Sequence, residues 1–298
     1  MADPEEFATF MDTHQVANYL RVKERKIYDL VKEKRIPCVR VTGKWLFPKA
    51  AIDAWLQSNA DGTPSSRQHA PPVAAGSHDP LLEWCLNRLD GQLAMLPGTS
   101  CDGLARMAAT EASLAGVHLL DLDSGEYNVP QVRSALSDRN VVLIEWAWRE
   151  QGLVVPAGNP LGLATMADLV SRRARVAMRQ QGAGARILFD WLSGQAGLPA
   201  TDLSLVDSAR NETEIGLAVS DGSADAGLAV ASVARSLRLD FVPLHRERFD
   251  LVIDRQAYFE PSLQRLFALA RSDEFRSKAA SLGGYDVSGL GTIRWNAP

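Results

Sequence analysis

Apolar positions near the start of the chain recur at helical spacing and then alternate. A short helix is predicted after a cap at Thr13, and a second over residues 24–34, because apolar residues recur with the helical period in both. Residues 38–47 alternate instead around a Thr-Gly-Lys turn, which is typical of a β-hairpin. Pro48 can begin a third helix over residues 49–56. The first 57 residues therefore predict a helix-turn-helix, a hairpin and a closing helix.

From Val73 onward, strand-like runs alternate with helical stretches. Strands are predicted at residues 141–148, 175–179, 203–207, 226–230 and 241–244, and helices at 81–89, 102–109, 131–137, 185–196 and 261–272. Strands separated by helices are typical of an α/β fold with a largely parallel sheet. Ligands of such sheets bind beyond the carboxyl ends of the strands, close to helix N-termini.

A segment of different composition separates these two patterns. Residues 58–75 contain three prolines and no Leu, Ile or aromatic residue. Such a segment buries too little apolar surface to offset the entropy lost on ordering. We therefore predict a domain over residues 1–57, a linker over 58–75 and a second domain over 76–298.

The charge of the chain is unevenly distributed between the two predicted domains. The 298 residues have a formal net charge of −4, yet residues 13–57 contain ten Lys/Arg and only four Asp/Glu. A small basic module joined to an acidic body indicates a polyanion-binding head. A solvated basic face without a binding role is the alternative.

The segment THQVANYLRVKERKIYDLVKEKRIPCVRVTGKWLFPKAAIDAWL resembles the excisionase-type, MerR-like winged helix-turn-helix domain of bacterial DNA-binding proteins. The resemblance implies that the second helix enters the major groove and that the hairpin touches phosphates. Contacts to base edges are expected from Arg25, Lys26, Tyr28 and Asp29, and contacts to phosphates from Lys23, Lys32, Arg40 and Lys44. One copy would read a half-site, so a homodimer on an operator duplex is expected.

Three turns in the second domain have the composition of anion-binding turns. Residues 75–80, 98–103 and 179–186 place glycines, hydroxyls or other small residues where a predicted strand passes into a helix. Free backbone N–H groups at such a junction can hold an anion, and ordinary helix capping is the alternative for any one turn. Neither a P-loop nor a G-x-G-x-x-G motif is present.

Stretches such as AGSHDPLLEW, RQQGAGARILFDWL and ADAGLAVASVA resemble the periplasmic-binding-protein-like ligand domain of cytoplasmic bacterial regulators, whose relatives resemble molybdate- and tungstate-binding proteins. The resemblance implies a two-lobed, type II α/β domain, with lobe one at residues 76–149 and 243–298 and lobe two at 151–242. The implied ligand-binding residues are Ser77, Thr99, Ser100, His118, Tyr127, Arg179, Gln180, Gly182, Ala183, Gly184, Arg186 and Asp225. Two hydroxyls of the family pattern are replaced by the alanines at 183 and 185.

The chain has few features of an enzyme or a metalloprotein. Its five histidines are scattered without metal-ligand spacing, and its three cysteines are too few and too far apart for a disulfide framework or a four-thiolate zinc site. The G-x-S-x-G nucleophile motif is missing. We therefore expect no catalysis, no metal and no cofactor. The sequence lacks an apolar run long enough for a membrane helix and a signal-peptide pattern, so a cytoplasmic location is expected.

The two resemblances together predict a one-component transcription regulator. Its head would bind operator DNA, and its two-lobed domain would sense a small anionic ligand, an oxyanion such as molybdate or tungstate. Two alternatives stay open. One is an excisionase-like architectural DNA-binding protein, and the other is a regulator whose ligand is a small organic metabolite.

Overall fold

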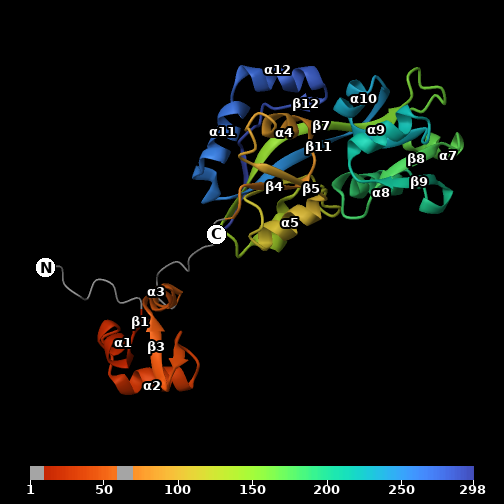
Figure 1. Ribbon diagram of the computed structural model, residues 1–298. Coiled ribbons are helices and arrows are strands. Elements are labelled where there is room, and N and C mark those ends of the chain that lie inside the picture. Colours follow the sequence, from red (N-terminus) through yellow and green to blue (C-terminus); the bar gives the residue numbers. More distant parts are fainter. Residues whose placement is uncertain (1–9, 59–69) are drawn as a thin grey trace. The chain divides into compact units, whose positions relative to one another are not determined.

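Residues 10–58 and 70–298 are described by the computed structural model (Figure 1). They belong to two units, Met1–Gln68 and His69–Pro298, each with its own packed interior. Most of the predicted linker falls at residues 59–69, outside the described residues. Its last three residues are not linker, because the first strand of the second unit begins at Val73.

The N-terminal unit follows the predicted order of elements. They are β1 (Phe10–Met11), α1 (Thr13–Tyr19), α2 (Glu24–Lys32), β2 (Val39–Val41), β3 (Lys44–Pro48) and α3 (Lys49–Ser58). The cap of α1 is Asp12 rather than Thr13, because the Asp12 carboxylate accepts the backbone N–H of Gln15 and the Gln15 side chain accepts the N–H of Asp12.

The hairpin forms the centre of this unit. Strand β3 pairs antiparallel with β2 on one side and with β1 on the other. The buried core is made by residues from all of these elements except β2, together with Ile36: Met11, Val16, Ala17, Ile27, Ile36, Phe47 and Ile52. The exposed strand β2 therefore lies outside the core, as a wing.

The second unit consists of two lobes joined by two long strands. Lobe one contains β4 (Val73–Ser77), α4 (Pro80–Leu86), β5 (Ala94–Gly98), α5 (Ser100–Ala108), β6 (Leu114–Val117), α6 (Val129–Leu136), η2 (Ala257–Phe259), α11 (Pro261–Ala270), α12 (Asp273–Leu282), β12 (Tyr285–Asp286) and β13 (Ile293–Asn296). Lobe two contains α7 (Met166–Ser171), β8 (Arg175–Arg179), α8 (Gly184–Gln195), η1 (Ala200–Asp202), β9 (Ser204–Ala209), α9 (Glu212–Ser220), β10 (Ala226–Val230) and α10 (Ala231–Ser236). The long strands are β7 (Val141–Val155) and β11 (Asp240–Asp254).

The sheet of this unit is mixed rather than largely parallel. Among the described residues its main path runs β5-β4-β6-β11-β7-β10-β8-β9. Each end of this path is a parallel set of strands, whereas β6–β11, β11–β7 and β7–β10 are antiparallel pairs. The difference arises because the chain passes from lobe one to lobe two along β7 and returns along the neighbouring β11.

The predicted lobe boundary at residues 149–151 falls inside β7. The apolar run ends at Trp148, but the strand continues to Val155 because its backbone stays paired with β11. We call residues 148–151 of β7 and the paired residues 245–248 of β11 the crossover. At the crossover, charged and polar side chains follow one another in two strands that are mostly apolar elsewhere.

Helices cover both faces of each lobe (Figure 1). In lobe one, α4, α11 and α12 pack on one face, and α5 and α6 pack on the other. In lobe two, α7 and α8 pack on one face, and α9 and α10 pack on the other. Because the helices cover the faces of the sheet, the ends of its strands stay free of them, and the candidate site described below lies at strand ends. Within the described residues, the structure contains no helix long and apolar enough to cross a membrane.

Candidate functional site

The residues predicted to contact DNA lie on one helix and one hairpin. Helix α2 carries five of them, one precedes the helix, and two are on the hairpin strands: Arg25, Lys26, Tyr28, Asp29 and Lys32, then Lys23, then Arg40 and Lys44. All eight are exposed, whereas Ile27 of the same helix is buried in the core. Helix α2 thus exposes a polar face to solvent and packs its opposite face, through Ile27, into the core.

Several cations of this face have no partner among residues 10–58. Within residues 10–58, Arg25, Lys26 and Lys44 form no ion pair and no side-chain hydrogen bond. By contrast, Lys49 on α3 pairs with Asp53 at 3.1 Å. Unpaired cations on an exposed helix and hairpin are suited to contacts with phosphates and base edges.

In the second unit, three predicted hydroxyl residues meet at the carboxyl ends of β4 and β5. Ser77 Oγ lies 2.7 Å from Ser100 Oγ, and Ser100 Oγ accepts the backbone N–H of His118 at 3.2 Å. The turn is tight because Gly76 has φ +85°, and a Cβ there would lie 2.6 Å from the carbonyl oxygen of Gly116. Thr99 caps α5 through Asp102, so its hydroxyl also has a structural role.

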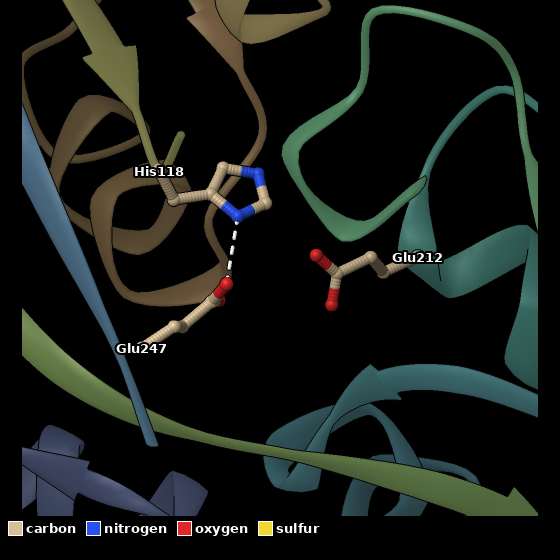
Figure 2. Close-up of side chains that lie close together, drawn as sticks. All are labelled: His118, Glu212 and Glu247. Atoms are coloured by element: carbon tan, nitrogen blue, oxygen red, sulfur yellow. Dashed lines mark hydrogen bonds and ion pairs between the residues drawn. The ribbon is translucent and has the colours of Figure 1, made fainter. Parts of the chain in front are cut away.

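His118 follows β6 and forms a buried pair with the crossover (Figure 2). Its Nδ1 lies 2.8 Å from Glu247 Oε2, and both side chains are almost fully buried. The imidazole also stacks on Phe249, two residues along β11. This contact fixes the position of the ring between the lobes.

Arg149 and Gln151 of the crossover connect this pair to further carboxylates. The Arg149 guanidinium pairs with Asp79 at 3.0 Å and with Glu247, and all three residues are buried. Gln151 Nε2 donates to Glu247 Oε1 at 2.8 Å and to Glu212 Oε1 at 3.2 Å. We call these residues, with His118, the interlobe cluster: Asp79, His118, Arg149, Gln151, Glu212 and Glu247.

Glu212 is the contribution of lobe two to the cluster (Figure 2). It is the first residue of α9, and its Oε2 accepts the backbone N–H of Val230 at the end of β10 at 2.7 Å. These contacts hold a buried carboxylate opposite His118 and Glu247. Both lobes therefore contribute to one buried polar cluster.

The turn at residues 180–184 of lobe two packs against residues of lobe one. A Cβ on Gly182 would lie 3.5 Å from Thr99 Oγ1, and a Cβ on Gly184 would lie 2.3 Å from the carbonyl oxygen of His118. Ala183 is buried here as the cap of α8. Only glycine fits at 184, which lets α8 begin against lobe one.

Arg179 and Gln180, just before this turn, carry polar atoms without partners. Arg179 is buried, forms no ion pair within the described residues, and its Nε has no hydrogen-bond partner. Gln180 Oε1 is likewise buried and unpartnered. Burial lowers the pKa of Arg179, while the charges of Glu212 and Glu214 oppose this effect. A buried cation of this kind can pair with an anion that enters the site.

The charges of the cluster determine the ionisation of Glu247. Burial alone raises the pKa of Glu247, but the charges of Arg149 and His118 outweigh burial, so that the pKa falls to about 2. Glu247 is therefore a carboxylate over the whole physiological pH range.

Three predicted ligand residues lie apart from the cluster. Asp225 precedes β10 and pairs with Arg175 at the amino end of β8, a strand length from the cluster, so we remove it from the site. Arg186 pairs with Asp190 along α8, on the outside of that helix turn. Tyr127 is buried, and its hydroxyl bonds to His245 rather than to a cluster residue.

The sequence predictions did not include Arg149, Gln151, Glu212 and Glu247 among the ligand residues. The available signal was the charged run at 149–151 and the run at 245–248, which interrupt apolar strands. A charged residue inside a buried strand needs a partner, and its presence indicates a site. Glu212 offered no comparable signal, because acidic residues are common in the first turn of a helix.

Comparison with known proteins identifies both parts of the chain. The profile of the PBP superfamily domain matches residues 86–271, which is more than half of the chain. The chain therefore belongs to the family of the PBP superfamily domain. A profile described as a helix-turn-helix domain matches residues 10–60. The chain is a DNA-binding regulator with a PBP-like ligand-binding domain, as the sequence resemblances predicted.

Related proteins and structures agree with this assignment of the fold. The uncharacterized protein YvgK of Bacillus subtilis (strain 168) is 26% identical over 296 residues, which cover 94% of this chain and 96% of YvgK. A tungstate ABC transporter structure from Geobacter sulfurreducens has a TM-score of 0.50 and 13% identity, over 69% of this chain and 95% of that chain. A phosphate-bound structure of a substrate-binding protein from Clostridium perfringens, described as a putative phosphate ABC transporter component, has a TM-score of 0.50 and 13% identity, over 74% and 99%.

Proposed function

We propose that this PBP-family protein is a one-component transcription regulator in which a small ligand binds between the two lobes and changes operator binding by a dimer. The observation that carries the proposal is the interlobe cluster, because a ligand contacting His118 on lobe one and Glu212 on lobe two depends on how the lobes are arranged. Such a ligand shifts the population only if it binds the DNA-competent and incompetent states with different affinity.

The proposed operator contacts rest on the unpaired cations of α2 and the hairpin. We propose that Arg25 contacts base edges, so Arg25→Ala is expected to relax sequence preference. We propose that Lys44 contacts phosphates, so Lys44→Ala should weaken binding to all duplexes and reduce the salt slope by about one. Lys49→Ala is the matched control, because Lys49 is an exposed lysine already paired with Asp53.

Binding of a selected operator duplex by the full-length protein, measured at several salt concentrations, tests these contacts. Wild-type behaviour of both Arg25→Ala and Lys44→Ala would remove α2 and the hairpin from the DNA interface. A binding curve that requires two copies per operator supports the dimer, and one copy per operator contradicts it.

We propose a small oxyanion, such as molybdate or tungstate, as the first ligand to test. The hydroxyls of Ser77 and Ser100, the N-terminus of α5 and the unpaired Arg179 are the groups that support an anion. The fold likeness to a tungstate transporter adds support. The carboxylates of Glu212 and Glu247 favour the alternative, an organic metabolite with a cationic or hydroxyl group.

Calorimetry with molybdate, tungstate, sulfate and a panel of metabolites distinguishes these ligands. Ser77→Ala should lower the affinity for an oxyanion by roughly tenfold, because the desolvated anion loses one hydrogen-bond donor. Ser113→Ala is the control, since Ser113 is a buried serine at the amino end of β6. Equal affinity of both variants would remove Ser77 from the site, and binding of none of the compounds would favour an architectural DNA-binding protein.

A further inference from the structure

Three side chains of the interlobe cluster form a set of potential metal ligands. His118, Glu212 and Glu247 each offer one ligand atom, and these atoms lie within 4.8 Å of one another (Figure 2). All three residues are buried, and they come from three separate elements, the end of β6, the start of α9 and the crossover of β11. Their closeness results from the tertiary fold.

The donor set has the chemistry of a transition-metal site. One imidazole nitrogen and two carboxylate oxygens are ligands of Zn²⁺ and similar divalent ions. With metal–ligand distances of about 2.0–2.2 Å, tetrahedral ligand atoms lie about 3.5 Å apart. The present spacings differ from this value by about an ångström, since the ligand atoms lie within 4.8 Å of one another and His118 Nδ1 is 2.8 Å from Glu247 Oε2.

The charge of the cluster calls for a cation. Three buried carboxylates, on Asp79, Glu212 and Glu247, face two buried guanidinium groups, on Arg149 and Arg179. With His118 as the neutral imidazole that ligates a metal, these groups include one more buried carboxylate than buried guanidinium groups. An uncompensated buried charge is strongly destabilising, whereas a bound cation removes the excess.

Gln151 provides an independent sign of a missing partner. Its Nε2 lies between Glu212 and Glu247, so the amide is inside the cluster. Its Oε1 is buried and has no hydrogen-bond partner. A carbonyl oxygen in this place can serve as a further ligand or accept a hydrogen bond from a metal-bound water.

We propose that His118, Glu212 and Glu247 bind a divalent transition-metal ion of the Zn²⁺ class and that this ion joins the two lobes. The inference rests on the proposed interlobe site but not on the identity of its effector. A divalent ion would also change the excess charge of the cluster from negative to positive, which favours an anionic effector at the adjacent Arg179. Metal and anion are then expected to strengthen each other's binding reciprocally.

Titration of the full-length, metal-free protein with Zn²⁺ tests this site, with calorimetry for affinity and elemental analysis for stoichiometry. Wild type is expected to bind one Zn²⁺ ion. In His118→Ala and Glu212→Gln the affinity for this ion should fall at least about tenfold or be lost. Glu212→Gln is the milder change, because Gln keeps an acceptor for the Val230 N–H and the Gln151 amide can rotate to suit it.

Two controls separate this site from surface binding. Glu214→Gln changes a neighbouring carboxylate of the same helix, which bonds to the backbone N–H of Arg210. His78→Ala removes another histidine beside a glutamate, Glu83, in the turn between β4 and α4. Both controls should bind Zn²⁺ like wild type.

The proposal is overturned if wild type binds no stoichiometric ion in excess Zn²⁺, or if Glu212→Gln binds as tightly as wild type while keeping its thermal unfolding transition. Operator binding, measured in parallel on the same samples, distinguishes this failure from failure of the proposed function. If wild type binds no stoichiometric Zn²⁺ but still binds operator and responds to ligand, only the metal site is rejected.

Discussion

Replacing Arg149 tests whether the interlobe cluster depends on its central cation. In Arg149→Met, a side chain of similar length stays in place, but Asp79 and Glu247 lose the guanidinium that pairs with both. All three side chains are fully buried, so solvent does not screen the two carboxylates that remain. Removing one partner of a buried ion pair costs about 3–5 kcal/mol. We expect the free energy of unfolding of the second unit to fall by that amount at pH 7.

Urea denaturation followed by tryptophan fluorescence measures this loss, since Trp146 donates to the same Asp79 carboxylate at 3.2 Å. Arg175→Met is the matched control, because it breaks an exposed arginine–aspartate pair at the far end of lobe two. Its midpoint should not change measurably. A loss below about 1 kcal/mol in Arg149→Met would contradict the assignment of Arg149 as the cation that neutralises two buried carboxylates.

Two further variants examine the contact between the lobes and its pH dependence. Gly184→Ala places a Cβ 2.3 Å from the carbonyl oxygen of His118 and should destabilise the closed lobes by about 1–3 kcal/mol in thermal unfolding. Gly194→Ala, in open space on the same helix, should be neutral or stabilising, and equal effects would contradict the close packing. Glu247→Gln should lower stability by about 3 kcal/mol at pH 7, because the folded pKa is about 2 and the ordinary value is 4.5. This stability is present above pH 4.5 and is lost as the pH falls towards 2, so urea midpoints of variant and wild type should converge there, and a constant difference would refute the shift.

Local pattern was sufficient for several of the elements and for part of the site. The strands at 175–179 and 226–230 match β8 and β10 because short apolar runs bounded by turns have few other conformations. The turns after β4 and β5, with Ser77 and Ser100, were found because small residues and hydroxyls are needed wherever a helix begins against a strand end.

Local pattern could not find the residues at the crossover. The apolar alternation of β7 stops at Trp148, and only pairing with β11, about a hundred residues later, keeps the following residues in strand conformation. His118, Glu212 and Glu247 are far apart in the sequence, and none belongs to a short motif. Asp225 was carried over from the family resemblance, but it directly precedes β10 and pairs with Arg175, which places it at the amino end of the strand.

The pairing of β7 with β11 makes the two lobes unequal as units of folding. Val155 and Asp240 are opposite each other in the sheet, so residues 156–239 form an insertion that leaves and re-enters at neighbouring positions. The buried residues of both lobe-one cores come from outside this insertion, whereas lobe two needs residues of β7 for its own cores. If residues 156–239 were removed and replaced by a short turn, β7 and β11 would form a hairpin on lobe one. All buried residues of the two lobe-one cores would still be present. We therefore expect lobe one to tolerate the loss of lobe two better than lobe two, whose cores use residues of β7, tolerates the loss of lobe one.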